Sequence, residues 1–193
     1  MFQDHLPLGS ETPTIVYMHE HEGGLENRIP LYNLLVHHVH ANVISIAHRG
    51  YSDSEGEPHE DGMKKDADAI LAFLENPETV SKEVAEMINK KLVFVHGKGT
   101  GGAEAIYMAH KANHLFRGLI VENAFTSMND MVEHHYFFSD WIKWLIKLEW
   151  DNTKIVPDLT LPIIFIGGTN DKHVPYEQTK KLFKLATNAY FKS

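Results

Sequence analysis

The chain has 193 residues, a formal net charge of −8 at pH 7 and 43% hydrophobic residues. This length and composition predict one soluble globular domain with a sizeable core. An acidic chain without a clustered Lys/Arg surface is not expected to bind nucleic acid, and the absence of cysteine excludes disulfides and thiolate chemistry. The sequence has neither an apolar run of roughly 18 residues nor a signal-peptide pattern at its start, so a cytoplasmic protein without a transmembrane segment is expected.

Five short runs rich in β-branched and aromatic residues have the pattern of buried strands. In chain order these runs are Thr14–Met18, Asn42–Ala47, Leu92–His96, Gly118–Glu122 and Ile163–Gly167. Helix-length segments alternate with them, at Asn27–His38, Gly62–Leu74, Val80–Asn89, Gly101–Ala112, Asp130–Leu148 and Tyr176–Ala186. This alternation predicts an α/β fold in which a doubly wound, mostly parallel sheet is covered on both faces.

The segment Tyr136–Ile146 is unusually aromatic. We expect it to form a helix that packs on its own domain, because amphipathic helices most often face a core. The alternatives are that it covers a pocket or makes a peripheral contact with a membrane surface.

Fourteen histidines are scattered along the chain, and most of them are expected at the surface. In the run His19-Glu20-His21-Glu22, alternate residues at a strand end point the same way, as the ligands of a metal ion would. The sequence gives no third ligand to complete such a site. A solvated loop is therefore expected here, and neither a metal nor another cofactor is predicted.

The most informative motif is Gly97-Lys98-Gly99-Thr100-Gly101-Gly102, which joins a strand-like run to a helix-like run. Enzymes with a nucleophile elbow carry Gly-x-Ser-x-Gly at such a junction, with the serine on a strained turn above the sheet. Gly99 stands where that serine would be. The same run also matches Gly-x-Gly-x-x-Gly through Gly97, Gly99 and Gly102, with Glu122 about 20 residues further on, so dinucleotide binding is an alternative.

Five segments, in one order along the chain, resemble those of a single superfamily. They are Pro13–His19, Arg49–Pro58, Gly97–Gly102, Val121–Phe125 and Gly168–Pro175. With them the chain resembles the α/β-hydrolase superfamily, specifically its eukaryotic serine-aminopeptidase-like, membrane-associated proteins, which include protein depalmitoylases. The resemblance runs from about Thr12 to Pro175 and implies one truncated α/β-hydrolase-like domain over residues 1–193.

The resemblance further implies that the family's first strands and its last strand and helix are missing. Exposed sheet edges at both sides are then expected, together with self-association through those edges. The family also suggests association with a membrane.

The resemblance assigns positions in the catalytic machinery. Asp171 falls at the family's acid position and Gly99 at its nucleophile position, whereas no histidine follows His173 to serve as the base. His173 itself is expected to be a surface residue, because it lies on the same loop as the acid. The two oxyanion positions correspond to His21 and Thr100, and the carboxylate of Glu20 opposes the stabilisation of an anion there.

Without a nucleophile and a base, the chain is predicted to be a catalytically inactive relative of the serine hydrolases, a pseudoenzyme. It would retain a cleft for a small acyl or lipid-like ligand. The second hypothesis is a residual hydrolase of acyl esters or thioesters that uses other groups. The third hypothesis is the dinucleotide-binding protein described above.

Overall fold

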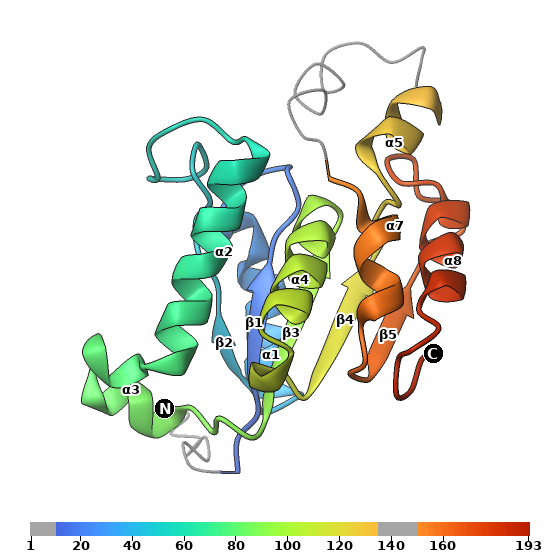
Figure 1. Cartoon of the computed structure of the whole chain (residues 1–193). Helices are drawn as coiled ribbons and strands as arrows, with labels where there is room; N and C mark the ends of the chain where they lie inside the picture. Colours follow the sequence, from blue (N-terminus) through green and yellow to red (C-terminus); the bar gives the residue numbers. More distant parts are fainter. Residues whose placement is uncertain (1–10, 135–149) are drawn as a thin grey trace.

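The computed structural model describes residues 11–134 and 150–193 of the chain (Figure 1). Its centre is a five-stranded sheet with the order β2-β1-β3-β4-β5, in which all neighbours are parallel. The strands are β1 (Thr14–Met18), β2 (Asn42–Ile44), β3 (Val93–Lys98), β4 (Gly118–Glu122) and β5 (Ile163–Ile166). The expected parallel α/β sheet is confirmed.

Helices cover the sheet on both sides. They are α1 (Ile29–His37), α2 (Glu60–Glu75), α3 (Lys82–Met87), α4 (Thr100–Lys111), α5 (Met128–His134), α7 (Asn152–Ile155) and α8 (Tyr176–Leu185). Helices α2, α4 and α7 lie on one face of the sheet and α1 lies on the other (Figure 1). Among the described residues, no helix is long and apolar enough to cross a membrane.

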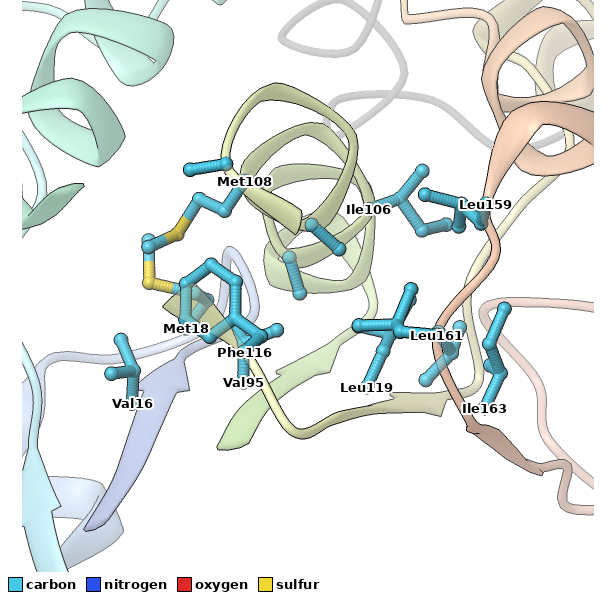
Figure 2. Close-up of a cluster of buried hydrophobic side chains, with 14 of the residues drawn as sticks. Val16, Met18, Val95, Ile106, Met108, Phe116, Leu119, Leu159, Leu161 and Ile163 are labelled. Carbon is cyan, nitrogen blue, oxygen red and sulfur yellow. The ribbon is translucent and has the colours of Figure 1, made fainter. Parts of the chain in front are cut away.

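The main core lies between α4 and the sheet (Figure 2). Ile106 and Met108 of α4 are buried with Val95 of β3 and Leu119 of β4, each at most 1% exposed. Full burial of such side chains stabilises the fold by about 1.5–3 kcal/mol each. Helix α4 is therefore firmly held, and so is the turn that leads into it from β3.

Two strands match their expected bounds, β1 and β4, whereas β2 and β3 differ and β5 ends one residue early, at Ile166. Strand β2 ends at Ile44 because the next residue, Ser45, donates its side-chain hydroxyl to the Tyr17 carbonyl oxygen at 2.9 Å. Strand β3 extends to Lys98, whose backbone is in register with Glu122 of β4. Local side-chain bonding and cross-strand pairing thus set bounds that the apolar pattern does not reveal.

The helix bounds follow capping side chains. Helix α2 begins earlier than expected because His59 Nδ1 accepts a hydrogen bond from the Gly62 amide at 3.0 Å. Helix α3 begins after Ser81, whose hydroxyl accepts from the Val84 amide at 3.3 Å. The expected helix over 130–148 overlaps α5 only at its start, and its remainder, with the aromatic segment 136–146, lies outside the described residues.

The expectation of exposed sheet edges is wrong at the β5 side. The amide of Ile163 donates to Phe191 O and the amide of Phe165 donates to Ser193 O, both at 2.8 Å. The last residues of the chain therefore pair in parallel with β5, and Lys192 lies opposite Ile163. At the other side, no strand within the described residues pairs with the outer edge of β2.

Candidate active-site pocket

A pocket of about 130 Å³ lies at the carboxyl ends of the strands, where ligands of parallel α/β sheets generally bind. Four loops and α5 form its wall. The lining residues are Glu20, His21 and Glu22 after β1, Lys98, Gly99 and Thr100 after β3, Asn123 and Phe125 after β4, Asp171, His173 and Val174 after β5, and Met131 of α5. The topology brings together all four site residues expected from the sequence, namely His21, Gly99, Thr100 and Asp171.

Gly99 occupies a sharp strand-to-helix turn with φ of 56° and ψ of −117°. This backbone conformation is strained for any residue with a side chain. The Gly99 amide donates to Glu122 O at 2.9 Å, which fixes the turn against the end of β4. The elbow geometry is therefore present at the position where the sequence offers no nucleophilic oxygen.

The other glycines of the motif are required by packing. A Cβ on Gly97 would lie 2.1 Å from Gly101 O, and a Cβ on Gly101 would lie 2.1 Å from Met18 O. A Cβ on Gly102 would lie 2.6 Å from Ala124 Cβ. Close approach of α4 to β1 and β3 thus accounts for these glycines without a bound pyrophosphate.

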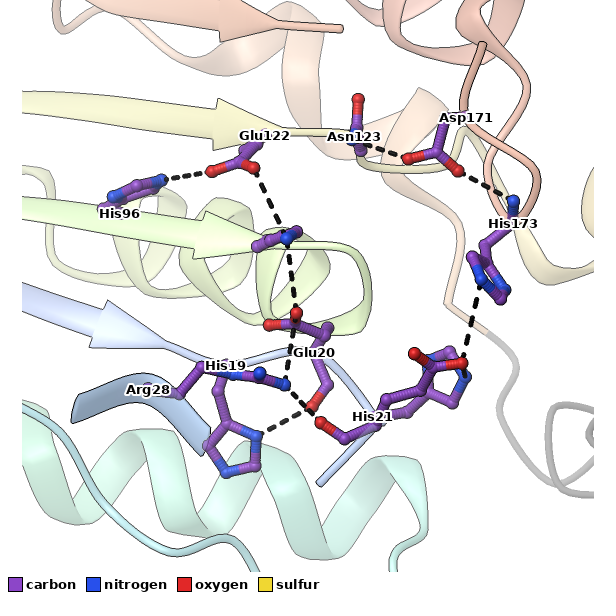
Figure 3. Close-up of polar contacts among 11 residues, drawn as sticks. His19, Glu20, His21, Arg28, His96, Glu122, Asn123, Asp171 and His173 are labelled. Carbon is purple, nitrogen blue, oxygen red and sulfur yellow. Dashed lines mark hydrogen bonds and ion pairs between the residues drawn. The ribbon is translucent and has the colours of Figure 1, made fainter. Parts of the chain in front are cut away.

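Glu20 fills the space above the elbow. A Cβ placed on Gly99 would lie 3.1 Å from Glu20 Cβ, closer than most real contacts of this kind. The Glu20 carboxylate is held by Arg28 at 3.1 Å and by Lys98 at 3.3 Å (Figure 3). The Glu20 side chain is therefore anchored beside Gly99.

A row of ion pairs continues from Glu20 along the strand ends (Figure 3). Lys98 Nζ lies 3.6 Å from Glu122 Oε1, and Glu122 Oε2 lies 3.2 Å from His96 Nε2. The hydrogen bond from His96, followed by the charge of Lys98, lowers the pKa of Glu122 against the effect of burial. This ionised carboxylate is thus engaged by protein groups, which leaves it poorly placed to hold a ribose.

Asp171 is engaged by its surroundings. Its carboxylate accepts hydrogen bonds from Asn123 Nδ2 at 2.7 Å and from the backbone amides of His173 and Val174 at 2.7 and 2.8 Å (Figure 3). None of these three donors is an imidazole. The ring of His173 instead points to Glu22, with Nε2 at 3.8 Å from Oε1. His173 is half exposed, in line with its expected place at the surface.

The two oxyanion positions differ in their surroundings. Burial, opposed in part by the charge of Glu22, lowers the pKa of His21. Thr100 begins α4 and is buried, and its hydroxyl has no hydrogen-bond partner among the described residues. The expectation of a solvated loop after β1 is wrong for His19, which is 1% exposed.

Three contributors to this site were missed in the sequence, namely Arg28, His96 and Asn123. Opposite charges at neighbouring strand ends, as in Lys98 and Glu122, were a usable signal for the ion-pair row, because parallel strands end at one edge of the sheet. Arg28 gave no such signal, since it reaches Glu20 from a turn before α1. In the sequence, Asn123 stands out only as part of the segment Val121–Phe125, which does not indicate its contact with Asp171.

The parallel sheet, the elbow after β3 and the acid on the loop after β5 define an α/β hydrolase. Residues 78–189 match the Peptidase_S9 model, described as the prolyl oligopeptidase family. The chain belongs to this family of α/β hydrolases, as its motifs indicated.

Curated relatives align with nearly the whole chain. Protein bem46 of Schizosaccharomyces pombe is 31% identical and aligns with 96% of this chain and 61% of its own length. The lysophosphatidylserine lipase ABHD12 of Danio rerio is 26% identical over 93% of this chain and 49% of its own length. The chain thus spans about three fifths of the first relative and half of the second.

Solved esterases share the fold. Est1E of Butyrivibrio proteoclasticus, determined with ferulic acid bound, has a TM-score of 0.70 at 16% identity over 93% of this chain and 78% of its own. The Pyrococcus furiosus esterase Pf2001 has a TM-score of 0.72 at 16% identity over 95% of this chain and 72% of its own. At these identities the likeness concerns the fold alone.

Proposed function

We propose that this chain is a non-catalytic α/β hydrolase that binds a small acyl or lipid-like ligand in the pocket at the strand ends. The observation that carries the proposal is the elbow. Gly99 has the strained conformation of a nucleophile position, and Glu20 fills the adjoining space. The Asp171 carboxylate accepts its hydrogen bonds from Asn123 and from amides of its own loop.

The magnitude of the loss supports an inactive protein. Removal of the nucleophile from a serine hydrolase lowers turnover on the order of a millionfold. What remains is binding and whatever oxyanion stabilisation the amides after the elbow supply. In this chain the Glu20 side chain also lies against the elbow, where its Cβ would be 3.1 Å from a Cβ on residue 99, and it narrows the space for a bound acyl group.

The pocket wall supports a ligand with an apolar part and a small head group. Phe125, Met131 and Val174 supply apolar surface. Charged side chains stand beside this apolar surface in a pocket of about 130 Å³, so the wall offers both an apolar contact and a polar one. A lipase among the relatives makes a lipid-like ligand the natural class to test.

The charges of the wall favour a neutral or cationic head group. Glu20, Glu22 and Asp171 line the pocket, and the two cations beside them, Arg28 and Lys98, are already paired with Glu20 and, for Lys98, also with Glu122. An anionic head group would meet net repulsion there. We therefore expect hexyltrimethylammonium to bind more tightly than hexanoate of the same chain length.

The test of inactivity is a fluorophosphonate probe applied to the folded, purified protein. We expect no covalent labelling of any serine, whereas an active serine esterase labels fully under the same conditions. The variant Gly99→Ser should also remain unlabelled, because it supplies an oxygen without a base. Labelling of the unmodified chain would overturn the proposal in favour of a residual acyl ester or thioester hydrolase.

The test of binding is a thermal-shift and calorimetric titration with hexyltrimethylammonium and hexanoate. We expect a rise in melting temperature with the cation that disappears in Phe125→Ala. A matched control is Phe183→Ala, which removes an aromatic ring next to Phe165, away from the pocket. Absence of binding by both ligands would contradict the proposed pocket.

A further inference from the structure

A second cluster of polar side chains lies next to the turn that bears Glu20 and His21, outside the pocket wall. His19 follows β1, His48 lies on the loop after β2, and Glu104 belongs to α4; each is at most 1% exposed. The ring centroids of His19 and His48 are 4.4 Å apart, and His48 Nδ1 lies 3.4 Å from Glu104 Oε2. Three elements thus bring three titratable groups together in the interior.

The polar atoms of this cluster have too few partners. Nε2 of His19, both ring nitrogens of His48 and both carboxyl oxygens of Glu104 are buried without a hydrogen-bond partner among the described residues. Buried polar groups in proteins are nearly always paired, so five such atoms in one place require an explanation. Packing alone does not supply one.

One contact ties the cluster to the pocket. His19 Nδ1 lies 2.8 Å from Glu20 O (Figure 3). Because a carbonyl oxygen only accepts, Nδ1 carries the hydrogen and donates it, which holds the backbone of the turn. The orientation of the His19 ring therefore sets where Glu20 and His21 lie.

We infer that His19, His48 and Glu104 form a positioning unit that holds one shared proton and fixes the Glu20–His21 turn. With one proton on the His48–Glu104 pair, the two groups are either both neutral or form an ion pair. If the pair holds no proton, the Glu104 carboxylate is buried without an opposite charge. If the pair holds two protons, the His48 imidazolium is buried without an opposite charge. Both of these states are costly for groups that are at most 1% exposed.

The groups that surround the unit support a single proton. Burial, followed by the charge of Asp66 on α2, raises the pKa of Glu104, and burial, followed by the charge of His19, lowers the pKa of His48 to about 3. Asp66 is itself held by Arg49, whose Nε lies 3.0 Å from its Oδ2.

Two more titratable or charged groups face the unit. Tyr51, on the loop after β2, stacks edge-on against His19, and its pKa is raised by burial and by the charge of Glu104. Burial, assisted by the charge of Arg28 before α1 and opposed by the hydrogen bond to Glu20 O, lowers the pKa of His19. Neither group supplies a second proton to the pair near neutral pH.

The shared proton predicts a dependence of stability on pH. In the unfolded chain the ordinary pKa values are about 6.5 for histidine and 4.3 for glutamate, so above about pH 7 the two residues hold no proton. The folded pair still holds one. Stability therefore falls as pH rises above 7, by up to tenfold in the unfolding equilibrium constant per pH unit, until the folded pair loses its proton. Between about pH 4.5 and 6.5 both states hold one proton, and the pair contributes no slope.

The first test compares urea unfolding of the unmodified chain and of Glu104→Gln from pH 7 to 8.5. As pH rises, the unfolding equilibrium constant of the unmodified chain should increase by up to tenfold more per pH unit than that of Glu104→Gln, because glutamine cannot titrate. Glu86→Gln, an exposed change on α3, should keep the slope of the unmodified chain. Equal slopes for the unmodified chain and Glu104→Gln would overturn the inference.

The second test begins with the unmodified chain alone, so its first measurement does not depend on the folding of a variant. Imidazole ¹⁵N spectra of the unmodified chain should show His19 as the Nδ1–H tautomer from pH 5.5 to 8, and an Nε2–H tautomer would overturn the inference. If Glu104→Leu folds, amide exchange at residues 20–22 should rise more than tenfold over Glu104→Gln, and unchanged exchange would contradict positioning. Neither test uses a pocket ligand, so this inference can fail without affecting the proposed function, and the proposed function can fail without affecting this inference.

Discussion

The turn after β3 and the loop after β5 both keep the backbone of a hydrolase site, but they differ in what their side chains do. At the first, the strained conformation of Gly99 persists without a reactive group, and Glu20 fills the space beside it. At the second, the acid remains, and it ties its own loop together through two amides and Asn123.

The difference teaches that residues at the positions of a hydrolase site can be required by packing or by loop structure. The glycines around the elbow hold α4 against β1 and β3, and Asp171 closes a loop. Neither reason involves catalysis. A residue at a catalytic position is therefore weak evidence of catalysis until its hydrogen-bond partners are known.

The largest expected effect comes from the packing of the elbow. Gly101→Val places a side chain against Met18 O, where a Cβ alone would lie at 2.1 Å, and we expect a loss of about 3 kcal/mol of stability in urea unfolding. Gly118→Ala serves as the control, because the nearest atoms to its Cβ would be Phe94 Cδ1 at 3.3 Å and Pro162 O at 3.4 Å, both far more distant than Met18 O is from a Cβ on residue 101. A loss of less than about 1 kcal/mol for Gly101→Val would show that α4 can move away from β1.

The next effect concerns the loop after β5. Asp171→Ala removes a charged acceptor of three hydrogen bonds, and we expect a loss of about 2 kcal/mol in free energy of unfolding. Asn123→Ala should be non-additive with it in a double-mutant cycle, because the two side chains share a bond. Additive losses would show that Asp171 acts on the loop without Asn123.

A smaller effect tests the match between Gly99 and Glu20. Gly99→Ala should cost about 1–2 kcal/mol, from its positive φ and from contact with Glu20 Cβ at 3.1 Å. In a Glu20→Gly background the steric part is relieved, so the cost of Gly99→Ala should fall by at least about 0.5 kcal/mol. The same cost in both backgrounds would show that Glu20 does not restrict the side chain at position 99.

The smallest expected effect is a pH dependence of stability that comes from His21 in the pocket wall. The pKa of His21 is lowered in the folded chain, so the unfolded chain binds more protons as pH falls through the ordinary histidine range. The unmodified chain should therefore lose stability relative to His21→Gln between pH 7 and 5, as followed by thermal unfolding. A difference that does not change with pH would show that His21 titrates alike in both states.

Much of the fold could be predicted because it depends on local pattern. The apolar runs gave β1 and β4 their bounds, and alternation of strands with helices gave a parallel sheet. Bounds that depend on side-chain hydrogen bonds, such as the end of β2 at Ile44, just before Ser45, could not be predicted in this way. Pairing of residues 191–193 with β5 was also missed, because the run is too short to show a period.

Within the candidate site, the sequence determined which groups are present: Gly99, which carries no nucleophilic oxygen, together with Asp171, His21 and Thr100. Tertiary structure decided what those groups contact. It placed Glu20 over the elbow, engaged Asp171 with Asn123 and buried His48 against Glu104. These contacts join residues far apart in the chain, and their energies depend on burial and distance, which a linear pattern does not contain.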